Sequence, residues 1–228
     1  LRGAAARDRL QQIARSMTQL LFLASGAIVV SVLVVNGGFV AWWVGAAGYG
    51  GLTLTAVLLA SMFVRQVNFA AVYTLFCFGY ERRLAVTSVA DGLVGAAAML
   101  ILVPLIGPIG APAGLTLATL LVSLPANLRA LGRETGTEPL AFLSFWSTWA
   151  VRFVLVLGCA AVVAVSLDGS AWWVAGLAAA GVAAVYGVVM APELARPPLG
   201  PMLVERVGPW RLFGAPWGRP AGEHGVAP

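Results

Sequence analysis

The sequence predicts an all-α fold, a polytopic membrane bundle of about six transmembrane helices. Of its 228 residues, 60% are apolar and only 10% are charged, whereas soluble domains carry about 25% charged residues. No charged residue occurs from position 17 to 64, or from 92 to 128. Each of these runs exceeds the roughly 20 residues that cross a hydrocarbon core of about 30 Å. Each run must therefore fold back, and glycines and prolines mark where.

The first element is predicted over residues 1–16, where arginines alternate with Leu10, Ile13 and alanines at roughly helical spacing. This pattern is typical of a basic amphipathic helix that lies at the headgroup surface. A soluble linker helix would have the same pattern.

Six apolar spans follow, separated by clusters of glycine, proline or charged residues. Turns or loops are predicted at 45–51, 79–83, 107–112, 132–139 and 168–170. The spans cover about 17–40, 52–78, 84–106, 113–131, 145–167 and 171–190. Trp42 and Trp43 follow the first span and fit the aromatic belt at a membrane interface.

These elements predict five parts of the chain. They are an interfacial helix (1–16), a four-span half-bundle (17–131), a cytoplasmic loop (132–144), a two-span hairpin (145–191) and a cytoplasmic, Pro/Gly-rich tail (192–228). The tail has a composition that favours disorder. The four spans are expected to pack compactly with the hairpin at their periphery.

The arginines predict the orientation of the bundle. All 14 basic residues are arginine, and twelve of them fall on one side of the predicted spans, while the opposite loops contain none. Arginine and lysine are enriched in cytoplasmic loops. The arginine-rich side is therefore expected to face the cytoplasm, with both ends of the sequence on that side.

Arg65 lies near the middle of the second span and is the sharpest candidate for a functional residue. An arginine at the bilayer centre costs at least about 2.5–3.5 kcal/mol on insertion scales. Gln66 and Asn68 keep this part of the helix polar. One interpretation is a substrate-binding site in which the guanidinium faces an anion such as a phosphate. The alternatives are a structural ion pair with Asp91 and a snorkelling side chain.

Asp91 lies inside the third span, on its cytoplasmic side. A carboxylate at this depth has four interpretations: it relays protons, binds a sodium ion, neutralises Arg65 as an ion-pair partner, or reaches water without any role. The sequence leaves these open.

Other residue types predict little chemistry. Cys77 and Cys159 belong to no CxxC pair, and His224 is the single histidine. No metal site, cofactor or disulfide is therefore expected. No nucleophile–base pair, P-loop or dinucleotide motif occurs, so the sequence predicts no enzymatic activity. The arginines are dispersed around apolar spans, which does not favour nucleic acid as a partner.

Small residues predict close helix packing around the turn at 107–112. Gly110 and Gly114 are four residues apart, and small residues let membrane helices approach closely. Pro104 and Pro125 are expected to bend their helices.

Three motifs over about half of the chain carry a family resemblance. They are FVAWWVG (39–45), YERRL (80–84) and LILVPLIGPIGAPAGLTLATLL (100–121). The stretch from about 17 to 133 resembles the carboxy-terminal half of polysaccharide-biosynthesis flippases. These belong to the multidrug/oligosaccharidyl-lipid/polysaccharide exporter superfamily. Many members have an asparagine in the third span where this chain has Gly95, so no role of that asparagine is carried over.

The resemblance implies a flippase that moves lipid-linked saccharide precursors, of the undecaprenyl-phosphate type, across the bacterial cytoplasmic membrane by alternating access. It also implies an amino-terminal half that this sequence lacks. A drug or toxic-compound exporter of the same superfamily is the first alternative. A non-transporting membrane scaffold subunit is the second, and a membrane glycosyltransferase is the last.

Overall fold

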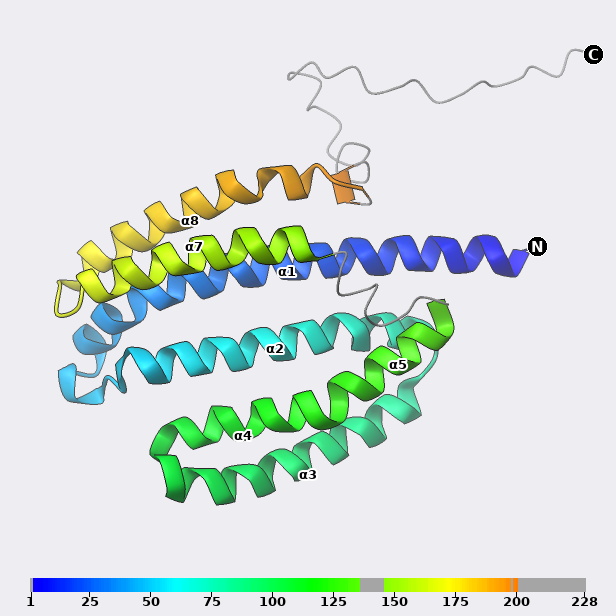
Figure 1. The fold of residues 1–228 in the computed structure, drawn as a ribbon, viewed down its shortest axis with the longest axis horizontal. Helices are drawn as coiled ribbons and strands as arrows, with labels where there is room; N and C mark the ends of the chain where they lie inside the picture. The colour runs from blue at the N-terminus through cyan, green and yellow to red at the C-terminus, as the bar shows by residue number, and fades with distance from the viewer. Residues whose placement is uncertain (1, 136–145, 198, 201–228) are drawn as a thin grey trace, which may run out of the picture.

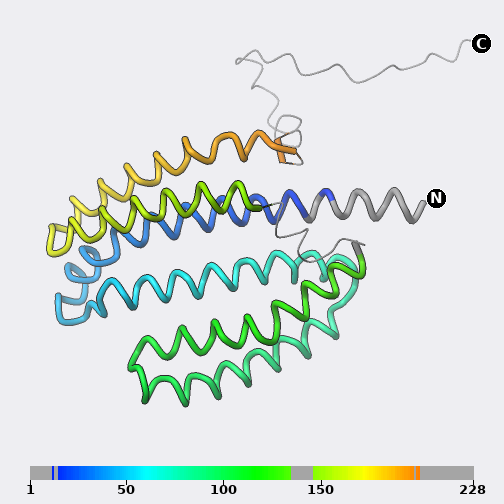
Figure 2. The backbone as a smooth tube through the Cα atoms, viewed as in Figure 1, coloured from blue at the N-terminus to red at the C-terminus, as the bar shows by residue number. Residues whose placement is uncertain are grey.

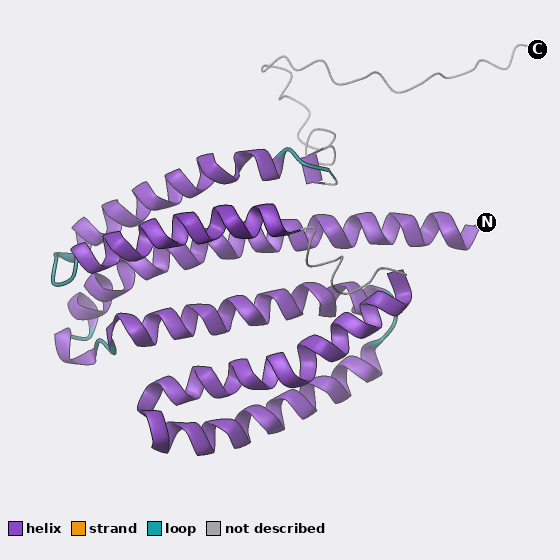
Figure 3. Cartoon of the chain, viewed as in Figure 1, coloured by secondary structure: helices purple, strands orange, loops and turns teal. Residues whose placement is uncertain are grey.

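The computed structural model describes residues 2–135, 146–197 and 199–200, with the backbone alone for 2–11, 13, 14 and 135 (Figures 1 and 2). Within these residues the chain is helical and contains no β-strand (Figure 3). The α-helices are α1 (Arg2–Trp43), α2 (Gly51–Cys77), α3 (Glu81–Ile106), α4 (Gly110–Ala118), α5 (Leu124–Thr135), α7 (Ser147–Ser166) and α8 (Trp172–Leu194). Three short elements join them: the 3₁₀ turns η1 (Ala46–Gly48) and η2 (Gly107–Ile109) and the π-helical segment η3 (Thr119–Ser123).

Five helical segments of the described chain are long and apolar enough to cross a membrane. They are Arg15–Trp43, Gly51–Cys77, Glu81–Glu134, Ser147–Ser166 and Trp172–Leu194. The predicted helical membrane bundle is confirmed at this level. The segment Glu81–Glu134 has 54 residues and folds back at η2, so that α3 and α4 run side by side in opposite directions (Figure 1).

The turns lie where the glycines predicted them. All five described residues with positive φ are glycines, and each belongs to a predicted turn: Gly45, Gly51, Gly79, Gly107 and Gly169. At Gly107, φ is 70° at the point where α3 ends and the chain reverses. A side chain at this φ would clash with the backbone, which is why glycine ends the helix here. Residues 132–135 continue α5, and the rest of the predicted loop, 136–144, lies outside the described residues.

The first predicted element needs correction. Residues 2–16 do not form a separate interfacial helix, because α1 runs without interruption from Arg2 to Trp43. No proline or glycine occurs between Gly3 and Gly26, and alanine, glutamine, leucine and arginine all favour helix. At 1.5 Å per residue the helix is about 63 Å long, roughly twice the membrane core. Its amino-terminal part therefore extends beyond the apolar span.

The carboxy-terminal end of the described chain also differs from the prediction. The sixth span was expected to end near position 190, but α8 continues through Pro192 to Leu194. Leu199 is buried against the core, so this part of the predicted tail is packed. The residues from 201 onward lie outside the described part, and the expected disorder there stays a prediction.

The helices form two packing regions that meet at α2. In Figure 1, α7 and α8 lie on one side of α1, and α2 lies on the other, followed by α4–α5 and α3. The larger core joins α1, α7 and α8 with part of α2, and includes Phe22, Val30, Trp149, Phe153 and Met190. The smaller core joins α2, α3 and α5, and includes Ala71, Leu75, Leu84, Ala130 and Leu131.

This arrangement differs from the expected four-span half-bundle with a peripheral hairpin. Helix α1 packs mainly with α8, α2 and α7 rather than with α3–α5. The reason is that large side chains of α7 and α8 pack against Phe22 and its neighbours on α1. Apolarity alone does not reveal such complementarity in a chain whose spans are all apolar.

The close approach of α3 and α4 depends on glycine. A Cβ atom at Gly110 would lie 2.4 Å from the carbonyl carbon of Leu102, and one at Gly114 would lie 2.8 Å from the backbone nitrogen of Met99. Neither backbone atom can move aside cheaply. The predicted packing role of these glycines is confirmed.

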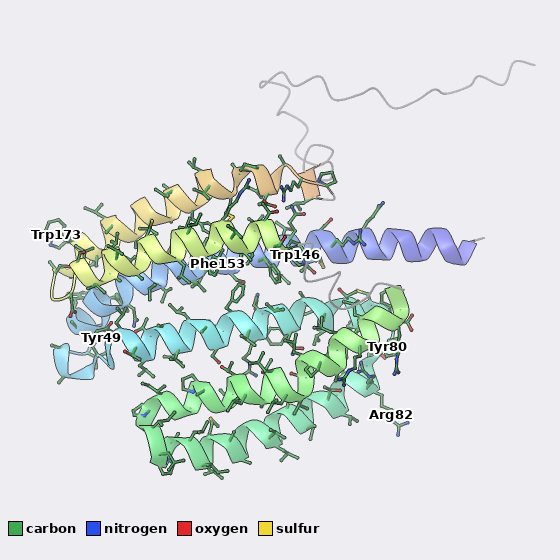
Figure 4. The ribbon with its side chains drawn as sticks, in the orientation of Figure 1. Tyr49, Tyr80, Arg82, Trp146, Phe153 and Trp173 are labelled. Atoms are coloured by element: carbon green, nitrogen blue, oxygen red, sulfur yellow. The ribbon has the colours of Figure 1, made fainter. Side chains whose placement is uncertain are left out.

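The two ends of the bundle differ in charge. Tyr80 and Arg82 lie at one end, and Tyr49 and Trp173 lie at the other (Figure 4). The turns at 44–50, 107–109 and 167–171 contain no arginine. Among the described residues, the arginines other than Arg65 thus lie toward the end where α1 and α3 begin.

Candidate functional site

One face of α2 carries polar side chains at membrane depth. Ser61, Arg65 and Asn68 are spaced by four and three residues and therefore share a helix face. Ser61 and Asn68 are buried, with relative exposures of 4% and 9%, and Arg65 is half-buried. Among the described residues, Arg65 makes no hydrogen bond or ion pair.

Four side chains from α3, η3, α2 and α5 form a continuous chain of hydrogen bonds, called here the polar chain: Asp91, Ser123, Asn68 and Asn127. The Asn127 amide Nδ2 donates to Asn68 Oδ1 at 2.9 Å. The Asn68 Nδ2 donates to Ser123 Oγ at 3.2 Å, and Ser123 Oγ donates to Asp91 Oδ1 at 2.8 Å. Helices α2, α3 and α5 are thus joined through the end of η3.

The π-helical segment η3 places Ser123 in this chain. Thr119 and Ser123 are the first and last residues of the segment. Both are buried, with relative exposures of 1% and 3%. Pro125 lies two residues after the segment; it has no N–H, and its ring would clash with the carbonyl of Leu121 four residues earlier. A wider turn avoids this clash and bends the helix between α4 and α5 (Figure 1). The bend predicted from Pro125 is therefore present.

The polar chain lies deep within the predicted membrane spans. Asn68 is nine residues before the end of α2 at Cys77, and Asp91 is ten residues after the start of α3 at Glu81. At 1.5 Å per residue both lie roughly 14–15 Å from those helix ends, about half the thickness of a bilayer core. Unsatisfied polar groups are costly there. The buried Asn127 Oδ1 has no hydrogen-bond partner among the described residues.

The predicted candidates are only partly brought together. Asn68 and Asp91 are linked through Ser123. Arg65 lies one turn from Asn68 on the same face, and Gln66, which is half-buried, makes no hydrogen bond with the described residues. No ion pair joins Arg65 to Asp91 in the described chain, where both ion pairs involve Glu193. The ion-pair alternative is not observed.

Sequence reasoning missed Ser123 and Asn127. They are four residues apart around Pro125, in a segment otherwise rich in leucine. This spacing puts both on one helix face. A pair of polar residues at helical spacing beside a proline was the available signal.

At the arginine-rich end, two contacts close the α2–α5 region. Arg83 Nη2 donates to the carbonyl oxygen of Ala126, and the Tyr80 hydroxyl donates to Glu134 Oε1. The hydrogen bond to Glu134 raises the pKa of Tyr80 above its usual value of 10.0, with smaller contributions from desolvation and from the charge of Glu134. Arg83 and Tyr80 thus tie the turn at 78–80 and the start of α3 to α5.

Comparison with known proteins gives no assignment. No family model matches the chain, and neither a curated protein nor a solved structure matches it.

Proposed function

We propose that the chain is part of a membrane transporter of the flippase type, which moves lipid-linked saccharide precursors across the bacterial cytoplasmic membrane by alternating access. It would cross the membrane six times, with α3 and α4–α5 as separate crossings. The reversal at Gly107 supports this count, because its two limbs lie side by side. The three sequence motifs that resemble the carboxy-terminal half of polysaccharide-biosynthesis flippases support the family.

The observation that carries the proposal is Arg65. It is half-buried at mid-membrane depth and has no charged partner among the described residues. Charged groups within spans usually face the bundle interior or a water-filled cavity and mark a transport pathway. A guanidinium binds phosphate through two parallel N–H···O bonds. A lipid-linked saccharide carries its phosphates at the junction of lipid and sugar, and an arginine at this depth would hold them during transit.

The polar chain would bind the coupling ion. Asp91 has a carboxylate that accepts one hydrogen bond from Ser123, and the amides and hydroxyls nearby offer further oxygen atoms. Such a set suits either a proton or a sodium ion.

The orientation follows from the gathering of arginines at one end of the bundle. That end would face the cytoplasm. Topology reporters fused near Gly48 and Gly169 should report the outer side, and a reporter fused after Arg133 should report the cytoplasm. Opposite signals would contradict the orientation.

The proposal is tested by substituting Arg65 in cells whose glycan export depends on this protein. Arg65→Ala should abolish export while membrane abundance stays near normal, because no partner is left unpaired. Arg65→Lys keeps the charge but loses the planar fork and should retain partial export. Arg82→Ala, at an exposed arginine of the same region, is the matched control and should export normally. Loss of abundance with Arg65→Ala, restored together with export by adding Asp91→Ala, would contradict substrate binding by Arg65.

A second candidate is an exporter of cationic toxic compounds. The observation that favours it is that no arginine neutralises Asp91 among the described residues. Asp91→Asn should then abolish cation efflux, whereas Arg65→Ala should leave efflux intact. If neither substitution changes any transport, the remaining candidate is a scaffold subunit.

A further inference from the structure

A cluster of charged side chains joins α7 and α8 at the arginine-rich end of the bundle. Arg152 Nη1 lies 3.0 Å from Glu193 Oε1, and Arg196 Nη1 lies 3.0 Å from Glu193 Oε2. Each carboxylate oxygen is thus occupied by a different arginine. The Glu193 side chain is 7% exposed, whereas those of Arg152 and Arg196 are 29% and 45% exposed.

This cluster has more positive than negative charge. Two guanidinium groups share one carboxylate, which leaves one positive charge without a counterion inside the cluster. Coulomb attraction is several times stronger at a protein surface of low effective dielectric than in water. The excess charge therefore favours an additional anion.

The arginines also keep unused hydrogen-bond donors. A guanidinium has five N–H groups, and each arginine here directs one nitrogen, Nη1, to Glu193. The other nitrogens belong to side chains that are partly exposed. Their fork geometry matches the oxygens of a phosphate, which they bind in the bidentate manner.

The cluster is held in place by its surroundings. Gln19 Nε2 of α1 donates to the backbone oxygen of Glu193. The backbone nitrogen of Arg196 donates to the same oxygen at 3.3 Å. The buried Leu199 packs the following residues onto the core. A site whose donors are already positioned loses less conformational entropy when it binds.

The depth of this charged cluster in the membrane corresponds to the headgroup layer. Arg152 is the sixth residue of α7, roughly 8 Å from the start of the helix. Glu193 lies in the last turn of α8, and Arg196 lies two residues after the helix ends. Basic pockets between membrane helices on the cytoplasmic side recognise anionic lipid headgroups.

We propose that Arg152 and Arg196, positioned by Glu193, form a phosphate-binding site for the headgroup of an anionic membrane lipid. The site lies on α7 and α8, away from Arg65 and the polar chain, and does not depend on the transport function. A free phosphate ion has the same chemistry, so the experiment separates the two sources.

The test measures binding to the purified full chain in detergent micelles. Phosphatidylglycerol, phosphatidylcholine and inorganic phosphate are each titrated, and bound lipid is counted by native mass spectrometry. Wild type should bind phosphatidylglycerol about tenfold more tightly than phosphatidylcholine. Arg196→Ala should remove this preference, and Arg82→Ala should keep it. Competition by millimolar inorganic phosphate would support the phosphate site but assign it to a soluble ligand.

Glu193→Gln separates binding from a purely structural ion pair. It keeps the size of the side chain between the two arginines but removes its negative charge, so the affinity for phosphatidylglycerol should rise severalfold even if the unfolding temperature falls. A structural ion pair alone predicts lower stability with no change in lipid preference. Equal binding of both lipids by wild type, or an unchanged preference in Arg196→Ala, would overturn the proposal.

Discussion

In the region of α1, α7 and α8, aromatic rings interlock, whereas in the region of α2–α5 amides and hydroxyls connect the helices. Trp149 stacks on Phe153 with ring centroids 4.8 Å apart, and Phe22 lies 5.2 Å from Trp149. Phe63, which α2 contributes to this core, stacks on Trp149 at 5.6 Å. In the other region, three hydrogen bonds link Asp91, Ser123, Asn68 and Asn127. The segment that carries α3–α5 is also much less buried. In its apolar 18-residue stretch 6% of the residues are buried, against 39% in the corresponding stretch of α1.

The two regions should respond differently to motion. Aromatic packing is lost when the rings separate, and lipid replaces it only poorly because dispersion requires close contact. Hydrogen bonds between side chains can be exchanged for others or for water. We therefore expect the aromatic region to move as a rigid unit and the α2–α5 region to carry any rearrangement.

The largest expected effect is truncation in the aromatic cluster. Phe153→Ala should lower the free energy of unfolding in detergent by about 3 kcal/mol, because Phe153 packs on two other rings and leaves a cavity. The measurement is a titration with a denaturing detergent followed by circular dichroism. Val154→Ala, at a side chain that is 62% exposed, is the control and should change stability by less than about 0.5 kcal/mol. Equal effects would mean that the cluster contributes no more than lipid contact does.

A smaller effect is expected where α3 meets α4. Gly110→Ala should destabilise by about 2 kcal/mol, because the added Cβ meets the backbone of Leu102. Gly92→Ala is the matched control, since no atom lies within 4 Å of its added Cβ. It should be neutral or slightly stabilising, because alanine favours helix. Loss of stability in both variants would point to a general intolerance of substitution in the α3–α4 hairpin rather than to the contact.

The polar chain should contribute less to stability. Ser123→Ala removes a donor to Asp91 and an acceptor for Asn68. The expected loss is about 1 kcal/mol, since hydrogen bonds in membranes average about 0.6 kcal/mol each in double-mutant cycles. Combining Ser123→Ala with Asn68→Ala should cost less than the sum of the two. Strict additivity would mean that the two side chains do not interact.

The smallest expected effect concerns Tyr80, and it is seen only in how the stability changes with pH. Its pKa is raised above 10.0 by the hydrogen bond to Glu134, so the folded state favours the protonated hydroxyl. The stabilisation is fully present below the ordinary pKa and is lost as the pH rises through the raised value. Wild type should lose slightly more stability than Tyr80→Phe between about pH 9 and about pH 11. Thermal unfolding followed by circular dichroism at the two pH values measures this, and identical losses would exclude the contact.

The sequence by itself determined the helical membrane class, the positions of the turns and the end of the bundle that carries the arginines. These properties follow from composition and from local chemistry: long apolar runs must be helical in lipid, and the reversal at Gly107 needs a residue that tolerates positive φ. Arg65, Asn68 and Asp91 stand out for the same reason, since polar groups are rare within apolar spans.

Only the tertiary structure decided which helices are neighbours and which polar groups meet. All spans are apolar, so hydrophobicity does not distinguish one partner from another, and the choice depends on shape. Phe22 packs on the rings of α7, and Gly110 admits the backbone of α3. The same holds for the site: Ser123 meets Asp91 because a π turn before Pro125 aims it there. The spacing of residues along the sequence does not predict how the π turn rotates Ser123 toward Asp91. This rotation depends on how the chain relieves the clash at Pro125 within the packed helix.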